Sequence, residues 1–134
     1  MADAITCTVV TPEQTALETK ADFVALPLFD GEIGIAANHS PLIGRLGYGE
    51  MRIKSGGQTQ VYYVDGGFVQ VADNVVAVLT SRAVPAKNLD AAAAETQLQA
   101  ALGQVASSPE MFEIRDRKVA QARAQIRTAR RARL

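Results

Sequence analysis

The chain has 134 residues, which is enough for one ordinary domain and a short appendage. With 48% apolar residues and no Trp, its core has to be built mainly from Val, Ile, Leu and Ala. The formal net charge of +0 excludes a generally basic nucleic-acid-binding chain, and no apolar run reaches the roughly 18 residues that span a bilayer.

The N-terminus and the cysteine count favour a chain that stays in the reducing compartment where it is made. Met1-Ala2-Asp3-Ala4 has neither the pattern of a signal peptide nor that of a transit peptide. Cys7 is the only cysteine, so no internal disulfide can form. We expect Cys7 to be a small buried residue on a strand.

Short segments with a period of two predict an antiparallel β-sandwich or barrel before about residue 86. We expect Pro27 to close the second of these segments and Ser55-Gly56-Gly57 to form a hairpin turn. Gly66-Gly67 indicates a bend or a close approach of strands. The last segment is nearly all apolar, which predicts burial on both faces. The predicted strands cover residues 6–10, 18–26, 49–54, 60–64, 68–71 and 75–79.

Residues 29–42 (FDGEIGIAANHSPL) form the most distinctive stretch. Gly31 and Gly34 suit backbone turns that a Cβ atom would obstruct. Pro41 fixes its own φ and keeps Ser40 extended. The pattern predicts a sharply shaped loop that leaves a strand.

From about residue 87 the pattern becomes helical. Asn88 is a candidate N-cap, with Asp90 placed favourably against the helix dipole, and Leu98, Leu102 and Val105 form an apolar stripe. After a connection of about two to four residues, a Ser-Pro-Glu start signal at residues 108–110 predicts a second helix. Its apolar seam repeats every seven residues, with alanines between. The seam residues are Phe112, Val119 and Ile126.

The two predicted helices form an antiparallel hairpin with a thin, alanine-rich seam. Burial of an Ala methyl contributes far less than burial of a Leu side chain. We therefore expect the hairpin to be held weakly and to be able to detach or extend, with residues 84–87 as the only candidate hinge.

Charge is distributed unevenly along the chain. Residues 1–108 carry six Lys or Arg and eleven Asp or Glu, a net of −5, whereas residues 109–134 carry eight and three, a net of +5. Such a basic segment can be a solvated helix face, a nucleic-acid-binding surface or a docking surface for an acidic protein. Four of its basic residues fall on one side of the second helix: Arg123, Arg127, Arg130 and Arg131.

The sequence contains no recognisable catalytic or metal site. Its one His and one Cys give no metal-ligand cluster, and a Cys in mid-strand is a poor site for a thiolate. Phosphate-binding, dinucleotide-binding and nucleophile-elbow motifs are absent. We therefore expect no enzymatic activity and no cofactor, and a small enzyme with an unrecognised site is the least favoured hypothesis.

Six segments, in order and spacing, make the chain resemble the epsilon subunits of bacterial F-type ATP synthases. They are residues 9–14 (VVTPEQ), 29–42, 49–53 (GEMRI), 66–71 (GGFVQV), 74–79 (NVVAVL) and Leu89-Asp90. The resemblance implies a β-sandwich of about ten strands over residues 1–86 and a two-helix hairpin over residues 87–134.

The resemblance also implies a function. A member of this family is a non-catalytic subunit of the central rotor stalk, bound to the gamma subunit and to the ring of c subunits, and it couples proton flow to ATP synthesis. The C-terminal helices lie folded on the sandwich or extend into the alpha/beta catalytic head and inhibit ATP hydrolysis. Such a protein is peripheral to the cytoplasmic face of the bacterial inner membrane.

The resemblance assigns roles to two groups of residues. The c-ring-facing loop corresponds to Asp30, Gly31, Glu32 and His39, although His39 has an equally good interpretation as a residue that shapes the loop by a hydrogen bond. The inhibitory contacts to the beta subunit correspond to Arg123, Arg127, Arg130 and Arg131.

One departure from the family concerns ATP. Some relatives bind ATP in the folded hairpin through an (Ile/Leu)-Asp-x-x-Arg-Ala pattern. Leu89 and Asp90 are present here, but Ala93 occupies the Arg position, so we expect only a remnant of that site and weak or no ATP binding. The alternative function is a free-standing nucleic-acid-binding protein that uses the basic helix.

Overall fold

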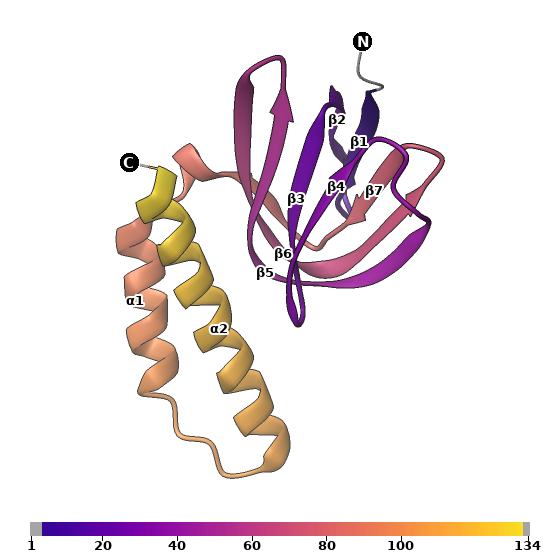
Figure 1. Cartoon of the computed structure of the whole chain (residues 1–134). Coiled ribbons are helices and arrows are strands. Elements are labelled where there is room, and N and C mark those ends of the chain that lie inside the picture. Colours follow the sequence, from indigo (N-terminus) through magenta and orange to yellow (C-terminus); the bar gives the residue numbers. More distant parts are fainter. Residues whose placement is uncertain (1–3, 133–134) are drawn as a thin grey trace.

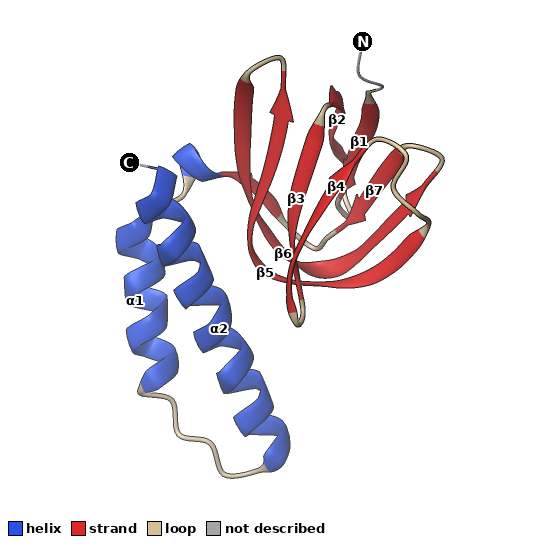
Figure 2. Cartoon of the chain, in the orientation of Figure 1, coloured by secondary structure: helices blue, strands red, loops and turns tan. Residues whose placement is uncertain are grey.

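The computed structural model describes residues 4–132, so Arg133 of the basic segment lies outside the described residues. A curled sheet forms one part of the molecule and a two-helix hairpin forms the other (Figures 1 and 2). The strands are β1 (Ile5–Val10), β2 (Thr15–Ala21), β3 (Phe23–Leu28), β4 (Gly31–Ala36), β5 (Leu42–Ser55), β6 (Gln58–Ala72), β7 (Val75–Leu79) and β8 (Ala83–Pro85). The helices are the 3₁₀ turn η1 (Ala86–Asn88), α1 (Ala91–Leu102) and α2 (Pro109–Ala132).

The sheet follows the order β2-β1-β7-β6-β5-β3-β4, and β8 pairs with the free edge of the first half of β6. Only the pairing of β1 with β7 is parallel. The described residues form eight strands where about ten were expected, because β5 and β6 run on for 14 and 15 residues without breaking. The predicted class, an antiparallel β-sandwich followed by a helical hairpin, is confirmed.

The core consists of inward-facing aliphatic side chains from strands that are distant along the sheet path. Because the sheet curls, side chains of β1, β3 and β4 meet those of β5, β6 and β7. This cluster is aliphatic apart from Cys7 and Met51, in line with the composition, and the aromatic Tyr63 is also fully buried but lies outside the cluster. Its largest members are Ile5, Leu26, Ile35, Met51 and Ile53.

Residues 18–26 were expected to form one strand, but they belong to two strands, β2 and β3. The break falls at Asp22, where the backbone N–H donates to the Lys54 carbonyl (2.8 Å) and Oδ2 accepts from Gly56 N–H (3.1 Å). The chain changes partner there, since β2 pairs with β1 whereas β3 pairs with β4 and β5. Pro27 does not end the strand. It lies where the pairing of β3 with β5 shifts register, so its missing N–H removes no bond from a regular ladder.

The expectation that β7 is buried on both faces was wrong. Val76 and Val78 are fully buried, but Val75 and Leu79 are 41% and 49% exposed. Gly66-Gly67 confirms the predicted close approach, because a Cβ built on Gly67 would lie 1.9 Å from the Leu79 carbonyl oxygen. The two glycines do not interrupt β6 but let it continue with φ of +74° and +106°.

The helical hairpin also departs from the expectation at several points. Asp90, not Asn88, caps α1, since its side chain accepts from the Ala93 N–H (3.1 Å) while Asn88 ends η1. The connection spans six residues, 103–108, and Ser108 caps α2 as predicted (Met111 N–H to Oγ, 3.2 Å). The proposed hinge at residues 84–87 is ordered structure within β8 and η1.

The apolar stripes are buried only where the two helices run close together. α2 lies between α1 and the sheet (Figure 1). Ala94 and Ala101 of α1 are buried, whereas Leu102 and Val105 are 39% and 80% exposed. On α2, Ile126 is buried and Phe112 is 48% exposed. The alanine-rich seam is therefore real, but its large apolar members do not extend it to the hairpin turn.

Candidate functional site

The structure divides the predicted c-ring-facing loop into two separate places. Residues 31–36 form strand β4 rather than a loop, because each of them pairs with β3. Gly34 is needed for packing, not for a turn, since a Cβ there would lie 2.6 Å from Cζ of Phe23. Asp30 and Gly31 stand at one end of β4, which is about 16 Å long, and His39 follows its other end.

Within the first group, Glu32 is engaged inside the molecule. Its Oε1 accepts from Arg52 Nη2 at 2.6 Å, and Arg52 Nη1 donates to Glu50 Oε1 at 3.0 Å. The bond that Arg52 donates to Glu50 has the larger effect and the bond to Glu32 the smaller, and both raise the pKa of Arg52 above its ordinary value. Asp30 and Glu32 are both exposed, and the Glu32 carboxylate is held by Arg52.

His39 belongs to a different cluster of turns. Its Nδ1 lies 2.7 Å from the carbonyl oxygen of Ser40. The preceding Asn38 has a φ of +65°, and its N–H donates to Oδ1 of Asn74 at 2.6 Å. This geometry matches the interpretation of His39 as a residue that shapes its turn, and the turn packs beside the 73–74 turn.

An exposed apolar surface on the sheet was missed by the sequence reasoning. We call Ile43, Phe68, Val75 and Leu79 the apolar sheet face. They point away from the core, with exposed fractions of 76%, 59%, 41% and 49%, and Phe68 stands directly opposite Leu79 on the neighbouring strand. Large exposed apolar patches mark interaction surfaces. The signal in the sequence was that residues 75–79 (VVAVL) are apolar at every position, so one face of this strand had to carry apolar side chains away from the core.

The apolar sheet face is extended by a cation–aromatic pair. The Arg45 guanidinium lies 4.6 Å from the centre of the Phe29 ring, and Phe29 is 69% exposed. Arg45 pairs with Phe68 across β5 and β6, so the pair adjoins the apolar sheet face. Aromatic and Arg side chains are enriched at protein–protein interfaces.

Three of the four predicted arginines, Arg123, Arg127 and Arg130, lie together on the exposed side of α2, as expected from their spacing. Arg123, Arg127 and Arg130 line a shallow groove with Glu95 and Leu98 of α1. Arg131 is turned toward the sheet, where its Nη1 is 4.0 Å from Oε2 of Glu50. Three of the four arginines thus present their charge to a partner that would approach the hairpin from outside.

Neither the remnant of the ATP motif nor the cysteine forms a reactive centre. Asp90 uses its side chain as the helix cap, and the neighbouring Leu89 is partly buried beside η1. Burial raises the pKa of the Cys7 thiol to about 11, which keeps it protonated at neutral pH. Over residues 4–132, no group of three or more His, Cys, Asp or Glu side chains is placed to hold a metal ion.

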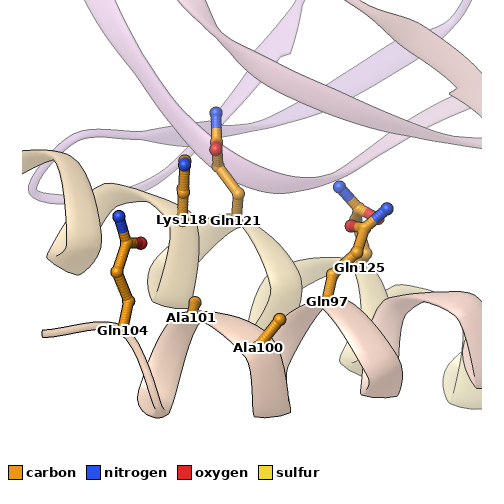
Figure 3. A pocket seen from close by; sticks show the side chains of 7 residues that line it. All are labelled: Gln97, Ala100, Ala101, Gln104, Lys118, Gln121 and Gln125. Carbon is orange, nitrogen blue, oxygen red and sulfur yellow. The ribbon is translucent and has the colours of Figure 1, made fainter.

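Two further clefts border α2 besides the arginine groove. One of about 350 Å³ lies between the helices, floored by alanines and lined by amides and one ammonium group (Figure 3). The other, of about 730 Å³, lies between α2 and the bend of the sheet and includes Arg45, Arg117 and Lys118. The first cleft offers hydrogen-bonding groups but no nucleophile beside a base. Its lining residues are Gln97, Ala100, Ala101, Gln104, Lys118, Gln121 and Gln125.

None of the helices in the described part of the chain is long and apolar enough to cross a membrane. Residues 4–86 match the family model of the ATP synthase delta/epsilon chain β-sandwich domain.

Relatives extend this similarity over nearly the whole chain. The ATP synthase epsilon chain of Rhodopirellula baltica is 50% identical over 127 residues, which cover 95% of this chain and 99% of the relative. That of Rubrobacter xylanophilus is 36% identical over 104 residues, covering 78% and 71%.

Solved structures show the same fold at lower identity. A chain of the Euglena gracilis mitochondrial ATP synthase (F1 with c-ring) has a TM-score of 0.80 at 22% identity, covering 97% of this chain and 81% of that one. A chain of the Tetrahymena thermophila mitochondrial ATP synthase central stalk and c-ring has a TM-score of 0.75 at 14% identity, covering 96% and 98%. Together with the family model and the relatives, these matches show that the chain belongs to the ATP synthase delta/epsilon family, as one of its epsilon chains.

Proposed function

We propose that this chain is a non-catalytic subunit of the central stalk of an ATP synthase, where it couples proton flow to ATP synthesis and restrains ATP hydrolysis. Residues 1–86 anchor it to the gamma subunit and the c ring, and residues 87–134 form the regulatory arm. Its place is the cytoplasmic face of the bacterial inner membrane, as a peripheral part of the complex. The relatives are named ATP synthase epsilon chains, and one structural neighbour is a central stalk with its c ring.

The apolar sheet face is the observation that carries the anchoring role. Four large apolar side chains share one side of β5, β6 and β7 without any cover from the rest of the described chain. A stalk subunit needs a durable contact with its neighbour, and burial of such side chains stabilises a complex. We assign this face to the gamma subunit.

The two ends of β4 give two candidate contacts with the c ring. Asp30 and Gly31 form the tip of the β3–β4 hairpin, and His39 lies in the turn at the other end. Since this tip presents exposed carboxylates, we assign the c-ring contact to Asp30 and Gly31, with Glu32 oriented beside them by Arg52. His39 serves mainly to shape its own turn.

The regulatory role rests on the arginines of α2. Arg123, Arg127 and Arg130 face outward from the hairpin while it is folded on the sheet, and an acidic segment of the beta subunit provides complementary charge when the hairpin extends. The nucleic-acid-binding alternative gains no support from the two relatives described above, both of which are named ATP synthase epsilon chains.

Binding of the full chain to the gamma subunit from the same source tests the anchoring role. F68E places a charge in the centre of the apolar sheet face, whereas Q60E introduces the same charge at an exposed polar position of β6. Loss of one buried Phe contact, about 1.5–3 kcal/mol, predicts at least tenfold weaker binding for F68E and an unchanged affinity for Q60E. Equal affinities of F68E and the unmodified chain would reject this assignment.

A further inference from the structure

The side of α2 that faces the sheet combines small buried side chains, Ala124 and Thr128, with polar ones, unlike the side that faces α1. Ala122, Ile126 and Ala129 recur at helical spacing and form the buried seam. Gln121, Gln125 and Arg131 instead reach toward side chains of β5 and β6. The directional contacts that attach the hairpin to the sandwich are therefore polar, and they sit beside closely packed small side chains.

Asp65 of β6 is the centre of these contacts. Its Oδ1 accepts hydrogen bonds from the Tyr63 hydroxyl at 2.9 Å and from Gln121 Nε2 at 3.0 Å. Figure 3 shows the Gln121 amide reaching from α2 toward the sheet. Asp65 is the sheet carboxylate that accepts a hydrogen bond directly from a side chain of α2.

The sheet holds Asp65 in place independently of α2. The Asp65 N–H donates to Oγ1 of Thr80 at 3.1 Å, and the Ser81 hydroxyl donates to the Asp65 carbonyl at 2.8 Å. These bonds fix the Asp65 backbone, and the Tyr63 hydroxyl of the same strand holds its carboxylate, so Gln121 is the part of the contact that can leave.

Tyr63 is the sheet partner of the Asp65 carboxylate in this contact. It is fully buried, and this burial, with the nearby Asp65 carboxylate, raises the pKa of its hydroxyl well above the ordinary range. Gln125, only 8% exposed, lies beside that hydroxyl. Detachment of α2 would expose these groups to water, which can replace each hydrogen bond at a modest net cost.

The second polar contact between α2 and the sheet is weak. Arg131 Nη1 and Glu50 Oε2 are 4.0 Å apart, the Arg131 side chain is 66% exposed, and Glu50 already pairs with Arg52. Exposed pairs of this kind contribute little to stability. Most of the specific attachment therefore comes from the contact at Asp65.

We infer that Asp65, Tyr63 and Gln121 form a polar latch that holds the hairpin on the sandwich and sets the fraction of molecules in which it is detached. The inference rests on the proposed function, in which the detached arm acts on ATP hydrolysis. A polar latch suits a two-state element, since its parts are satisfied in both states and the difference in free energy stays small.

Amide hydrogen exchange of the isolated full chain tests the latch. Q121E places a second carboxylate against Asp65, and Q104E makes the same change at an exposed residue after α1 that bonds to no sheet side chain. We expect exchange over residues 119–129 to be about ten- to a hundred-fold faster in Q121E, as for a lost charge-assisted hydrogen bond, because an undocked single helix frays readily. Q104E should match the unmodified chain.

A swapped pair gives the sharper test. In D65N/Q121E the new amide of position 65 can donate to the new carboxylate of position 121, while its oxygen still accepts from Tyr63. Protection of residues 119–129 should return to within a few-fold of the unmodified chain. Unchanged exchange in Q121E, faster exchange shared by β6 and β7, or failure of the swap to restore protection would each overturn the latch.

This outcome is separable from that of the proposed function. Exchange is measured on the isolated chain, so it reports docking alone, whereas regulation is read from ATP hydrolysis by the complex. If Q121E detaches the hairpin and hydrolysis by the complex does not respond, the latch stands and the regulatory role fails.

Discussion

Replacement of Gly67 by Ala should destabilise the sandwich far more than the size of one methyl group suggests. Gly67 has a φ of +106°, and a Cβ built on it would lie 1.9 Å from the Leu79 carbonyl oxygen and 2.9 Å from its carbon. Both atoms belong to the backbone, so no side chain can rotate away. β6 and β7 would have to separate next to the Phe68–Leu79 pair.

The cost has two parts. A non-glycine residue in this backbone region costs about 1–3 kcal/mol, and the loss of one or two ladder hydrogen bonds adds about 0.5–1.5 kcal/mol each. We expect a decrease of about 3–5 kcal/mol in the free energy of unfolding. For a domain with a total stability of about 5–15 kcal/mol, that is a large fraction.

Gly56 provides the matched control. It also has a positive φ, +57°, but a Cβ there meets nothing within 4 Å. G56A should cost only about 1–2 kcal/mol from the backbone conformation. Urea unfolding followed by far-ultraviolet circular dichroism measures both variants, and a difference of less than about 1 kcal/mol between them would refute the close approach of β6 and β7.

Three further predictions concern single sites. Burial raises the pKa of Cys7 to about 11 from an ordinary value of 9.0, so the native chain should resist iodoacetamide at pH 8 while the urea-unfolded chain reacts fully. The stability that this shift contributes is fully present below about pH 9 and is lost as the pH rises toward 11. A loss of stability in acid would therefore have another origin. ATP should bind with a dissociation constant above the millimolar range in calorimetry, because Ala93 supplies no charge and loss of such a contact costs about 1.5–3 kcal/mol; sub-millimolar binding would contradict this. D90A should lower the free energy of unfolding by about 1 kcal/mol, since it removes the cap of α1, whereas N88A should leave it unchanged.

The sequence was informative wherever local chemistry decided the structure. Ser108 and Pro109 began α2 where predicted, and the alternation at Met51 and Ile53 identified the core face of β5. The tight turns at residues 56–57 and 73–74 fell on glycine, Asp and Asn residues that accept positive φ. These features depend on a few neighbouring residues, so a single sequence suffices to predict them.

The errors arose where tertiary pairing overrode the local pattern. Gly31 and Gly34 favoured a loop, but the β3 partner and the Phe23 ring make the same residues a strand. Asn88 and Asp90 are both good caps, and only the η1 turn decides that Asp90 is used. Val75 and Leu79 pointed to burial because the sequence does not say whether another layer covers them.

The candidate site was predicted only in part. The grouping of the arginines on α2 follows from helical spacing, which the sequence shows. The separation of His39 from Asp30 depends on the length of β4, and the contact between Asp65 and Gln121 joins residues 56 positions apart. No periodicity reports such a contact, so the polar attachment of the hairpin required the structure.

ATP hydrolysis by an ATP synthase that has been depleted of its epsilon subunit tests the central claim most directly. The complex would receive the full chain or a variant in which Arg123, Arg127, Arg130 and Arg131 are all replaced by Gln, with R117Q/K118Q as a control on the same helix. We predict that all three bind, that the full chain and the control suppress hydrolysis, and that the fourfold variant suppresses it much less. Equal suppression by all three would contradict a regulatory role for these arginines, and failure of the full chain to bind or to affect hydrolysis would contradict the proposed function.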